Sequence, residues 1–287
     1  MNPNNTIKTD HWLNGFAANV NSQAGEDGII EKVLEALTDN NHWCVEFGAW
    51  DGIYLSNTYN LIANKGYAAV LIEGDRKRFR QLQKNFRGND RVKLINAFVG
   101  FEEDNVLDSL LQSTDIPVNF DLLSIDIDGN DYHVWSAVKH YKPKVVVIEY
   151  NPTIPNPIEF VQARDMRINQ GSSILSLYKL AKQKGYELVA ATRLNAIFVD
   201  SKYFALFGIK DNSVDAIRTE QPEVTYIFNG YDGTVFIRGY GRLVWHSIPY
   251  KEARLQQVPR WLRQYPENYG IIKRCLGKVY RLLRRVD

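Results

Sequence analysis

The residues best suited to chemistry are carboxylates that follow apolar, strand-like stretches of the chain. Asp126 and Asp128 come at the end of one apolar run, and Asp131 follows shortly afterwards. Glu149 stands near the end of the next apolar run. Because ligands of parallel sheets bind in the crevice beyond the carboxyl ends of the strands, these acids are expected at the binding edge. Close carboxylates repel one another, so a cation is expected between them.

Two chemical roles suit these acids. Asp126, Asp128 and Glu149 could converge on a hard divalent ion such as Mg²⁺, which would orient a substrate hydroxyl and lower its pKa. Alternatively, Asp126 only lines the ligand pocket, and Asp128 and Asp131 form a turn and a helix cap. Asp126 is also a candidate general base if its carboxylate is desolvated in the closed site. His133 is a further candidate base because imidazole titrates near neutral pH, although a surface histidine without a catalytic role is the alternative.

A second group of residues is spaced like a nucleoside-binding unit. Residues 45–52 form an apolar run that ends in a turn with Gly48 and Gly52, and residues 71–75 form another run that ends in an acid, Glu73. Such an acid accepts hydrogen bonds from both ribose hydroxyls, and glycines let the backbone approach the ligand closely. The sequence therefore predicts a bound nucleoside.

The glycine spacing and the charge of the turn indicate which nucleoside. A pyrophosphate favours the pattern G-x-G-x-x-G at a helix N-terminus, whereas three residues separate Gly48 from Gly52. Asp51 lies between the two glycines and Glu46 lies just before them, so the loop would repel a pyrophosphate and suit a sulfonium or ammonium cation. This pattern favours S-adenosylmethionine over NAD.

On these motifs the chain resembles the class I S-adenosylmethionine-dependent methyltransferases, and it is most similar to their FkbM-type sugar and natural-product branch. The resemblance covers roughly residues 20–200. The stretches that carry it are residues 22–27, 45–52, 71–75 and 123–129. It implies an α/β, Rossmann-like fold whose seven-stranded, mostly parallel sheet has an antiparallel last strand and helices on both faces. It also implies oxygen ligands for a metal after the fourth and fifth strands, as in metal-dependent O-methyltransferases.

The resemblance further implies a set of residues around S-adenosylmethionine. Glu73 would accept hydrogen bonds from the ribose hydroxyls. The complete predicted donor site consists of Gln23, Glu26, Glu46, Gly48, Asp51, Gly52, Asn57, Glu73, Gly74, Asp75 and Asp126.

Several of these residues have a simpler alternative. Glu46 and Asp51 would accept hydrogen bonds from the donor's ammonium group, but Asp51 could equally form an Asx-turn. Asn57 would bind the donor or only cap a helix. Gln23 and Glu26 would close the donor site, or their segment would only cap the helix that follows.

Alternating helical and strand-like stretches predict the sheet. The predicted strands are residues 42–47, 68–72, 92–98, 120–126, 144–150, 187–192 and 196–199. The predicted helices are residues 28–37, 56–65, 76–86, 106–111, 132–140 and 173–184. Only a few residues, Arg193 and Leu194 among them, lie between the last two strands, too few for a crossover helix, so these strands should pair as an antiparallel hairpin.

The chain changes character after about residue 200. Short strand-like runs at residues 224–228, 234–238 and 243–246, separated by Gly-rich turns, predict a small β appendage. Residues 268–286 place apolar side chains on one face and Lys and Arg on the other, which predicts a basic amphipathic helix. The predicted organisation is a polar N-terminal segment (1–20), a methyltransferase domain (21–200) and a C-terminal appendage with its helix (201–287).

Composition sets broad limits. The 287 residues, 45% hydrophobic and 24% charged, suit one catalytic domain with a small appendage, and a net charge of +2 gives no case for a nucleic-acid partner. The two cysteines, Cys44 and Cys275, are far apart and indicate a reducing compartment. We expect a cytoplasmic protein, with the basic helix either docked on the protein or lying on the inner face of the membrane.

The expected function is transfer of a methyl group from S-adenosylmethionine to a hydroxyl of a sugar, a surface glycan precursor or a related metabolite. Residues 151–157 form a proline-rich loop after the fifth strand, and Arg164 and Arg167 follow it, so we expect a polar acceptor pocket there. Two alternatives stay open: an NAD-dependent oxidoreductase or epimerase, and a non-catalytic scaffold that keeps the methyltransferase fold.

Overall fold

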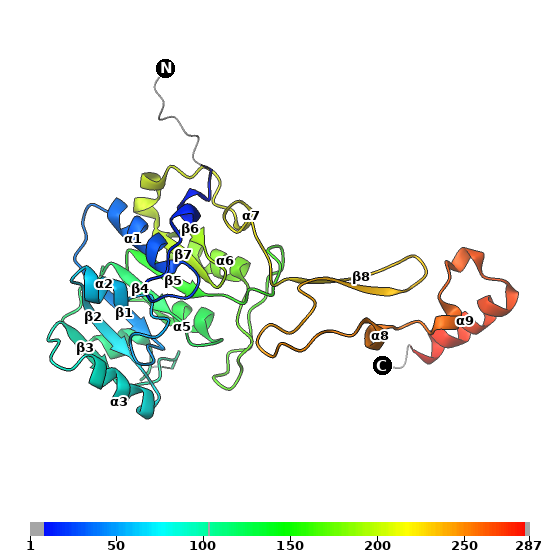
Figure 1. Cartoon of the computed structure of the whole chain (residues 1–287), viewed down its shortest axis with the longest axis horizontal. Helices are drawn as coiled ribbons and strands as arrows, with labels where there is room; N and C mark the ends of the chain where they lie inside the picture. The colour runs from blue at the N-terminus through cyan, green and yellow to red at the C-terminus, as the bar shows by residue number, and fades with distance from the viewer. Residues whose placement is uncertain (1–8, 103, 285–287) are drawn as a thin grey trace, which may run out of the picture. The chain divides into compact units, whose positions relative to one another are not determined.

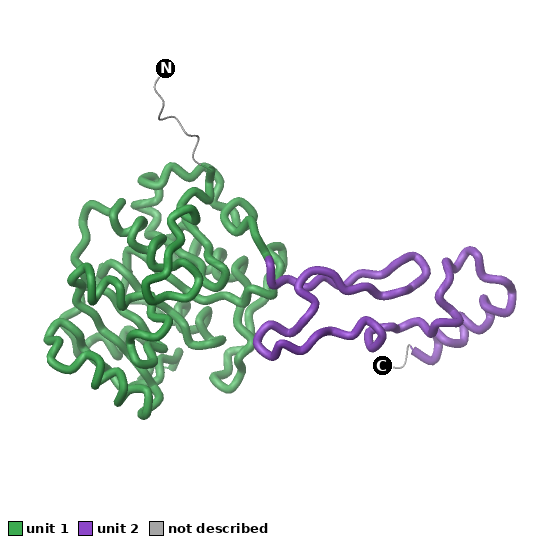
Figure 2. The backbone as a smooth tube through the Cα atoms, in the orientation of Figure 1, with its two compact units in different colours: residues 1–221 green, residues 222–287 purple. Residues whose placement is uncertain are grey.

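A computed structural model describes residues 9–102 and 104–284 of the chain. It forms two compact units, Met1–Gln221 and Pro222–Asp287 (Figure 2). The predicted catalytic domain ended at residue 200, whereas the first unit continues through helices η2 (Ser201–Phe207) and α7 (Val214–Ile217), which bury Phe207 and Ile217 in the core. Residues 1–8 of the predicted N-terminal segment lie outside the described residues.

The first unit is built on a seven-stranded sheet in the order β3-β2-β1-β4-β5-β7-β6. Its strands are β1 (Trp43–Phe47), β2 (Ala68–Ile72), β3 (Val92–Ile95), β4 (Leu122–Ile125), β5 (Val145–Glu149), β6 (Tyr186–Ala191) and β7 (Asn195–Asp200). Strands β1 to β5 pair in parallel, and β7 runs antiparallel to both of its neighbours, β5 and β6. The predicted Rossmann-like sheet with an antiparallel last strand is confirmed.

Helices pack around this sheet (Figure 1). They are η1 (Trp12–Phe16), α1 (Glu26–Ala36), α2 (Tyr59–Asn64), α3 (Arg76–Asn85), α4 (Leu107–Leu111), α5 (Asp131–Ala137) and α6 (Ile174–Lys184). The predicted helix over residues 132–140 was too long: α5 ends at Ala137, and the carboxylate of Asp108 accepts the backbone N–H groups of Lys139 and His140 instead. Gly185 ends α6 with a φ of 78°, a conformation that glycine adopts without strain.

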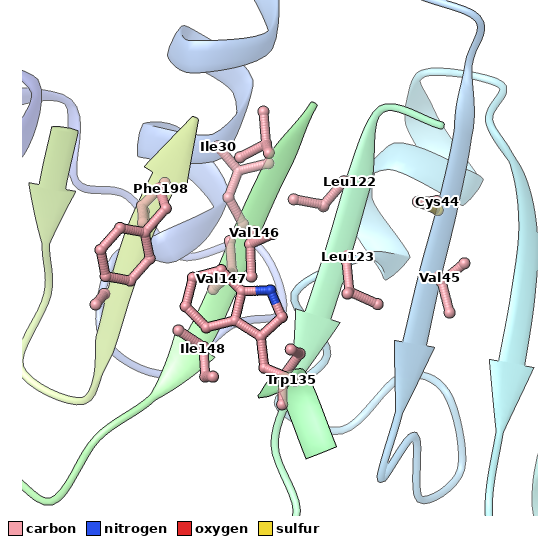
Figure 3. Packing of buried hydrophobic residues seen from close by; sticks show 14 of the residues in the cluster. Ile30, Cys44, Val45, Leu122, Leu123, Trp135, Val146, Val147, Ile148 and Phe198 are labelled. Atoms are coloured by element: carbon pink, nitrogen blue, oxygen red, sulfur yellow. The ribbon is translucent and has the colours of Figure 1, made fainter. Parts of the chain in front are cut away.

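The core explains why the strands are apolar throughout. Val45, Leu123, Val146 and Phe198 are register partners on adjacent strands, so they share one face of the sheet. The indole of Trp135, from α5, packs on Phe198 with ring centroids 5.3 Å apart (Figure 3). Because the strands are buried on both faces, they need no polar alternation. The contact holds α5, and the loop before it, against the sheet.

The second unit contains the hairpin of β8 (Thr225–Asn229) and β9 (Val235–Gly239). Four short or amphipathic helices follow: α8 (Glu252–Leu255), η3 (Arg260–Leu262), η4 (Pro266–Asn268) and α9 (Ile271–Leu283). The predicted third strand at residues 243–246 was wrong, because this segment folds back on itself: the N–H of Leu243 donates to the carbonyl of Ile248.

The predicted C-terminal helix is observed as α9, and residues 285–286 of that prediction lie outside the described part of the chain. None of the helices in the described ranges is long and apolar enough to cross a membrane.

Candidate active site

The loop after β1 lies directly against the end of β4. Gly48 has a φ of 72°, and a Cβ at this position would lie 1.9 Å from the carbonyl oxygen of Asp126. Gly52 has a φ of 76°, and a Cβ there would meet the side chains of Leu82 in α3 and of Phe86 just after it. Gly48 is itself exposed, between two buried residues. Both glycines are therefore required by the fold, and Gly48 leaves its backbone open to a ligand.

Glu46, which points from β1, organises the segment before α2. Its Oε2 accepts hydrogen bonds from the hydroxyls of Ser56 (2.5 Å) and Thr58 (2.8 Å), and its Oε1 accepts the N–H of Asn57 (2.9 Å). The side chain of Asn57 in turn donates to Ser124 Oγ at 3.1 Å. Residues 56–58 consequently lie outside the helix predicted to begin at 56. Burial raises the pKa of Glu46, and its role toward a donor ammonium stays a prediction.

Glu73 stands at the end of β2 and is buried. Its two carboxylate oxygens accept the N–H groups of Trp50 (2.8 Å) and Asp75 (2.6 Å). The carboxylate is thus held beside the Gly48 loop, where the ribose prediction requires an acid. Gly74 follows, and a Cβ there would lie 2.2 Å from the ring of Phe98, so only glycine lets this exposed ring cover the strand end.

Two of the predicted donor ligands make local structural contacts. Asp51 Oδ1 accepts the N–H groups of Ile53 (3.0 Å) and Tyr54 (2.8 Å), which is the Asx-turn alternative. Asp75 caps α3, because its carboxylate accepts two N–H groups of the first helical turn at 2.8 and 2.9 Å. These hydrogen bonds, the first-turn bond to Arg78 above all, lower the pKa of Asp75. The geometry favours these local roles for Asp51 and Asp75.

The N-terminal segment joins α1 to the β6–β7 hairpin. Glu26 is fully buried, and its Oε1 accepts hydrogen bonds from Thr192 Oγ1 (2.6 Å) and Asn195 Nδ2 (3.0 Å). Asp27 Oδ2 accepts three successive backbone N–H groups of residues 20–22 at 2.7–2.8 Å. Gln23 is exposed. Glu26 and Asp27 therefore hold this segment in place.

The acids after β4 and β5 come together. Ile125 of β4 pairs with Ile148 of β5, which places the residues that follow side by side. One carboxylate oxygen from each of Asp126, Asp128 and Glu149 lies within 4.8 Å of the other two. This is the set of three residues that the sequence suggested as a metal site.

The electrostatics of this acid cluster, Asp126, Asp128 and Glu149, are unfavourable without a cation. Burial, followed by the charges of Asp131 and Asp128, raises the pKa of Asp126 to about 8. Burial and then the charge of Asp126 raise the pKa of Glu149 well above its ordinary value. Throughout the described residues, no Lys or Arg forms an ion pair with the three acids. The donor set and its missing positive charge fit a hard divalent cation.

Asp131 shapes the loop that carries Asp128. Its two carboxylate oxygens accept the N–H groups of Ile127 and Gly129, each at 2.9 Å. Asp128 itself has a φ of 57°, the left-handed conformation that aspartate tolerates better than most residues. Burial raises the pKa of Asp131 to about 6. Asp131 therefore has a local structural role, although it orders the loop and does not cap α5 as the alternative interpretation predicted; Asp128 belongs to the acid cluster.

His133 contacts the segment between β5 and α6. Its Nε2 lies 2.8 Å from the carbonyl oxygen of Gln162. Because a carbonyl only accepts hydrogen bonds, Nε2 carries the proton and Nδ1 is the atom left for a base. Gln162 is buried and accepts the N–H groups of Gln170 and Gly171, both at 2.8 Å. The contact gives His133 a role in holding this segment, and its role as a base stays a prediction.

Arg218 shapes the proline-rich loop, although the sequence motifs did not predict it. It is buried and donates to the carbonyls of Pro152 (2.6 Å) and Ile154 (2.9 Å) and to Asn156 Oδ1 (3.2 Å). Its guanidinium also lies over the ring of Tyr150, 4.8 Å from the centroid. Sixty-odd residues separate Arg218 from its partners, so no local pattern could have indicated it.

Comparison with known proteins gives only distant similarity. No protein-family model and no curated protein sequence matches the chain. The N-terminal domain of EvdMO1 with SAH bound is 11% identical, with a TM-score of 0.39 over 61% of this chain and 80% of that one. TrmK from M. capricolum, in complex with S-adenosyl-homocysteine (SAH), is 13% identical, with a TM-score of 0.38 over 60% and 67%.

The CurJ carbon methyltransferase is 12% identical, with a TM-score of 0.40 over 60% of this chain and 52% of that one. Similarity at this level carries no information about the substrate of the present chain.

Proposed function

We propose that this chain is an S-adenosylmethionine-dependent methyltransferase that methylates a hydroxyl of a sugar, a glycan precursor or a related metabolite. The observation that carries the proposal is the convergence of Glu73, the exposed Gly48 backbone and the acid cluster at the carboxyl edge of one parallel sheet. Such a reaction needs three things: an acid that binds the ribose, a glycine turn open to the donor, and a group able to activate a hydroxyl.

The donor half rests on Glu73. Its carboxylate is fixed by two backbone N–H groups, so it can accept ribose hydroxyls without first being ordered. The sheet order and the antiparallel β7 agree with the class I methyltransferase sheet that the motifs implied.

The NAD alternative is disfavoured by the position of α2. This helix begins at Tyr59, seven residues after Gly52, so the glycine turn does not lead directly into a helix N-terminus that could bind a pyrophosphate. The carboxylate of Asp51, inside the same turn, would also repel the phosphates. A sulfonium donor meets neither obstacle.

The acceptor half rests on the acid cluster. Asp126, Asp128 and Glu149 would hold a divalent cation such as Mg²⁺, which lowers the pKa of a hydroxyl that it binds. As the alternative to a metal ligand, the Asp126 carboxylate is a candidate base: without a cation, burial raises its pKa to about 8, which makes the ionised form a stronger base than an ordinary carboxylate. The remaining work of the chain is positioning, because methyl transfer is an in-line displacement in which the oxygen must lie close to the methyl carbon.

The donor is tested by calorimetry with SAH. Glu73→Ala should weaken binding by about 1–3 kcal/mol, the cost of removing a carboxylate that accepts ribose hydroxyls. Asp75→Ala is the matched control: it removes a neighbouring acid that caps α3 and should leave SAH affinity unchanged. Equal SAH affinity for the wild type and a folded Glu73→Ala protein would contradict the proposal.

Two further outcomes identify the alternatives. A thermal-shift experiment in which NADH stabilises the protein and SAH does not would favour the oxidoreductase. Binding of neither ligand would favour the non-catalytic scaffold. The reaction itself is tested by incubating the protein with S-adenosylmethionine and a panel of sugars and nucleotide sugars, with and without Mg²⁺, and detecting methylated product by mass spectrometry.

A further inference from the structure

Helix α9 turns its apolar face to solvent. Ile271 (83%), Ile272 (76%), Val279 (53%), Leu282 (62%) and Leu283 (73%) are all largely exposed. Together with Leu276 and Cys275, which are also exposed, they fall within one arc of the helix at 3.6 residues per turn. We call these seven residues the α9 stripe. Amphipathic helices usually bury such a stripe, so its exposure requires an explanation.

The side of α9 that contacts its own unit lies opposite the stripe. Gly277 is the buried residue of the helix. A Cβ at this position would be 3.5 Å from the ring of Tyr269 and 3.8 Å from Leu262, which is ordinary contact distance. Within its unit, α9 therefore packs through the side that carries Gly277, and the stripe faces away from this contact.

The charge around the stripe is uniformly positive. Lys273, Arg274, Lys278, Arg281 and Arg284 occupy the rest of the helix circumference, and α9 contains no Asp or Glu. The whole second unit shares this bias: residues 222–287 have 12 Lys or Arg against 5 Asp or Glu, a net charge of +7. Residues 1–221 have 23 against 28, a net charge of −5, so the near-neutral total conceals a strong segregation of charge.

We propose that the α9 stripe binds an anionic lipid bilayer, with its apolar side chains in the headgroup region and its cations among the lipid phosphates. An exposed apolar arc bordered by Lys and Arg is what such interfacial helices have in common. The charge makes a second copy of the same stripe a poor occupant, because pairing two stripes would bring the cations that border each of them close together. A bilayer with acidic lipids supplies both the apolar medium and the opposite charge.

The proposal is independent of the proposed methyl transfer, and vesicle flotation tests it. The full chain should float with vesicles of phosphatidylcholine and phosphatidylglycerol, and should stay behind with phosphatidylcholine alone. Binding should weaken steeply with added salt. Ile272→Gln combined with Leu283→Gln should reduce binding at least tenfold, and because both side chains are exposed, the fold should survive.

Ile227→Gln is the matched control, since Ile227 is a similarly exposed apolar residue in β8 of the same unit. It should leave vesicle binding unchanged. Cys275 gives a direct readout of the stripe: Cys44 is buried, so an environment-sensitive thiol label attaches to Cys275. Its emission should shift to the blue with the anionic vesicles.

The proposal is overturned if the chain does not float with anionic vesicles, or if the double variant binds them as tightly as the Ile227→Gln control does. It is also overturned if analytical ultracentrifugation shows a dimer that the double variant dissociates, because the occupant is then a second copy. SAH affinity, measured in parallel, should be the same for all three proteins, so the test is separate from that of the donor site.

Discussion

The carbonyl oxygen of Asp126 occupies the space that a side chain on Gly48 would need, since a Cβ built there lies 1.9 Å from that oxygen. The turn after β1 is therefore in close backbone contact with the residue that follows β4, which is the first acid of the cluster. In the proposed reaction, the nucleoside at the Gly48 turn and the hydroxyl at the acid cluster would therefore be neighbours.

Gly48→Ala tests that relationship. The new methyl group must displace the Asp126 backbone, so we expect loss of SAH binding and a clear fall in melting temperature. Gly88→Ala is the control, because Gly88 has a similarly positive φ of 82° but nothing within 4 Å of an added Cβ. It should cost about 1–2 kcal/mol of stability from backbone strain and leave SAH affinity unchanged. Similar SAH affinity in both variants would argue against the close approach.

The fold could be predicted largely from local pattern, because buried parallel strands are short apolar runs and their helices end at glycines. The convergence of Asp126, Asp128 and Glu149 could also be predicted, since these acids stand at the ends of strands that are adjacent in the sheet. What the pattern could not distinguish was which acids face a ligand and which bind the chain's own N–H groups.

Asp75 and Glu26 illustrate this difficulty. Asp75 belongs to the same motif as Glu73, yet its carboxylate caps α3. Glu26 is bonded to Thr192 and Asn195, more than 160 residues away in the chain. A carboxylate accepts a ligand hydroxyl and a backbone N–H with the same geometry, so residue type and spacing alone do not separate the two roles.

The raised pKa of Asp126 predicts a dependence of stability on pH. In the folded state its pKa is about 8, against an ordinary value of 3.8, so the folded protein retains a proton that the unfolded chain has lost. The contribution of Asp126 to the free energy of unfolding is therefore greatest at low pH. It decreases as the pH rises toward about 8, by at most about 1.4 kcal/mol per pH unit.

Urea denaturation with EDTA present, across this pH range, provides the measurement. Asp126→Asn, which cannot ionise, should have a flatter profile than the wild type and should exceed it in stability above pH 8. Added Mg²⁺ should stabilise the wild type most at high pH, where the carboxylates are charged, and stabilise Asp126→Asn much less. Parallel pH profiles for the two proteins would show that Asp126 does not titrate as proposed.

Glu46 should matter mainly for the order of the segment before α2. Glu46→Ala leaves the Ser56 and Thr58 hydroxyls and the Asn57 N–H without their acceptor, so we expect a loss of at least about 1–3 kcal/mol in the free energy of unfolding. Glu46→Gln keeps one acceptor oxygen for the Asn57 N–H, and the two hydroxyls can rotate to accept from the new amide. It should be the milder change in urea denaturation; an equal loss in both variants would mean that the negative charge itself is needed.

Arg218 should control the order of the proline-rich loop. Arg218→Ala removes the donors to the Pro152 and Ile154 carbonyls and to Asn156, and it opens a cavity next to Tyr150. We expect a loss of more than about 2 kcal/mol in the free energy of unfolding, because hydrogen bonds from a buried charged group are the strong ones. Hydrogen exchange measured by mass spectrometry should accelerate in residues 152–156.

The same experiment separates loop order from global stability. Arg218→Lys keeps the charge but has a single ammonium group in place of the planar fork, so it should hold one of the carbonyls and accelerate exchange in the loop less than Ala does. Peptides from β2 and α3, which lie at the donor side of the sheet, should exchange as in the wild type under native conditions, and SAH affinity should be unchanged. If exchange rises equally in the loop and in β2, Arg218 stabilises the whole first unit and has no particular role at the acceptor side. If exchange rises in the loop alone, the buried guanidinium keeps in place the proline-rich loop, where we expect the acceptor pocket.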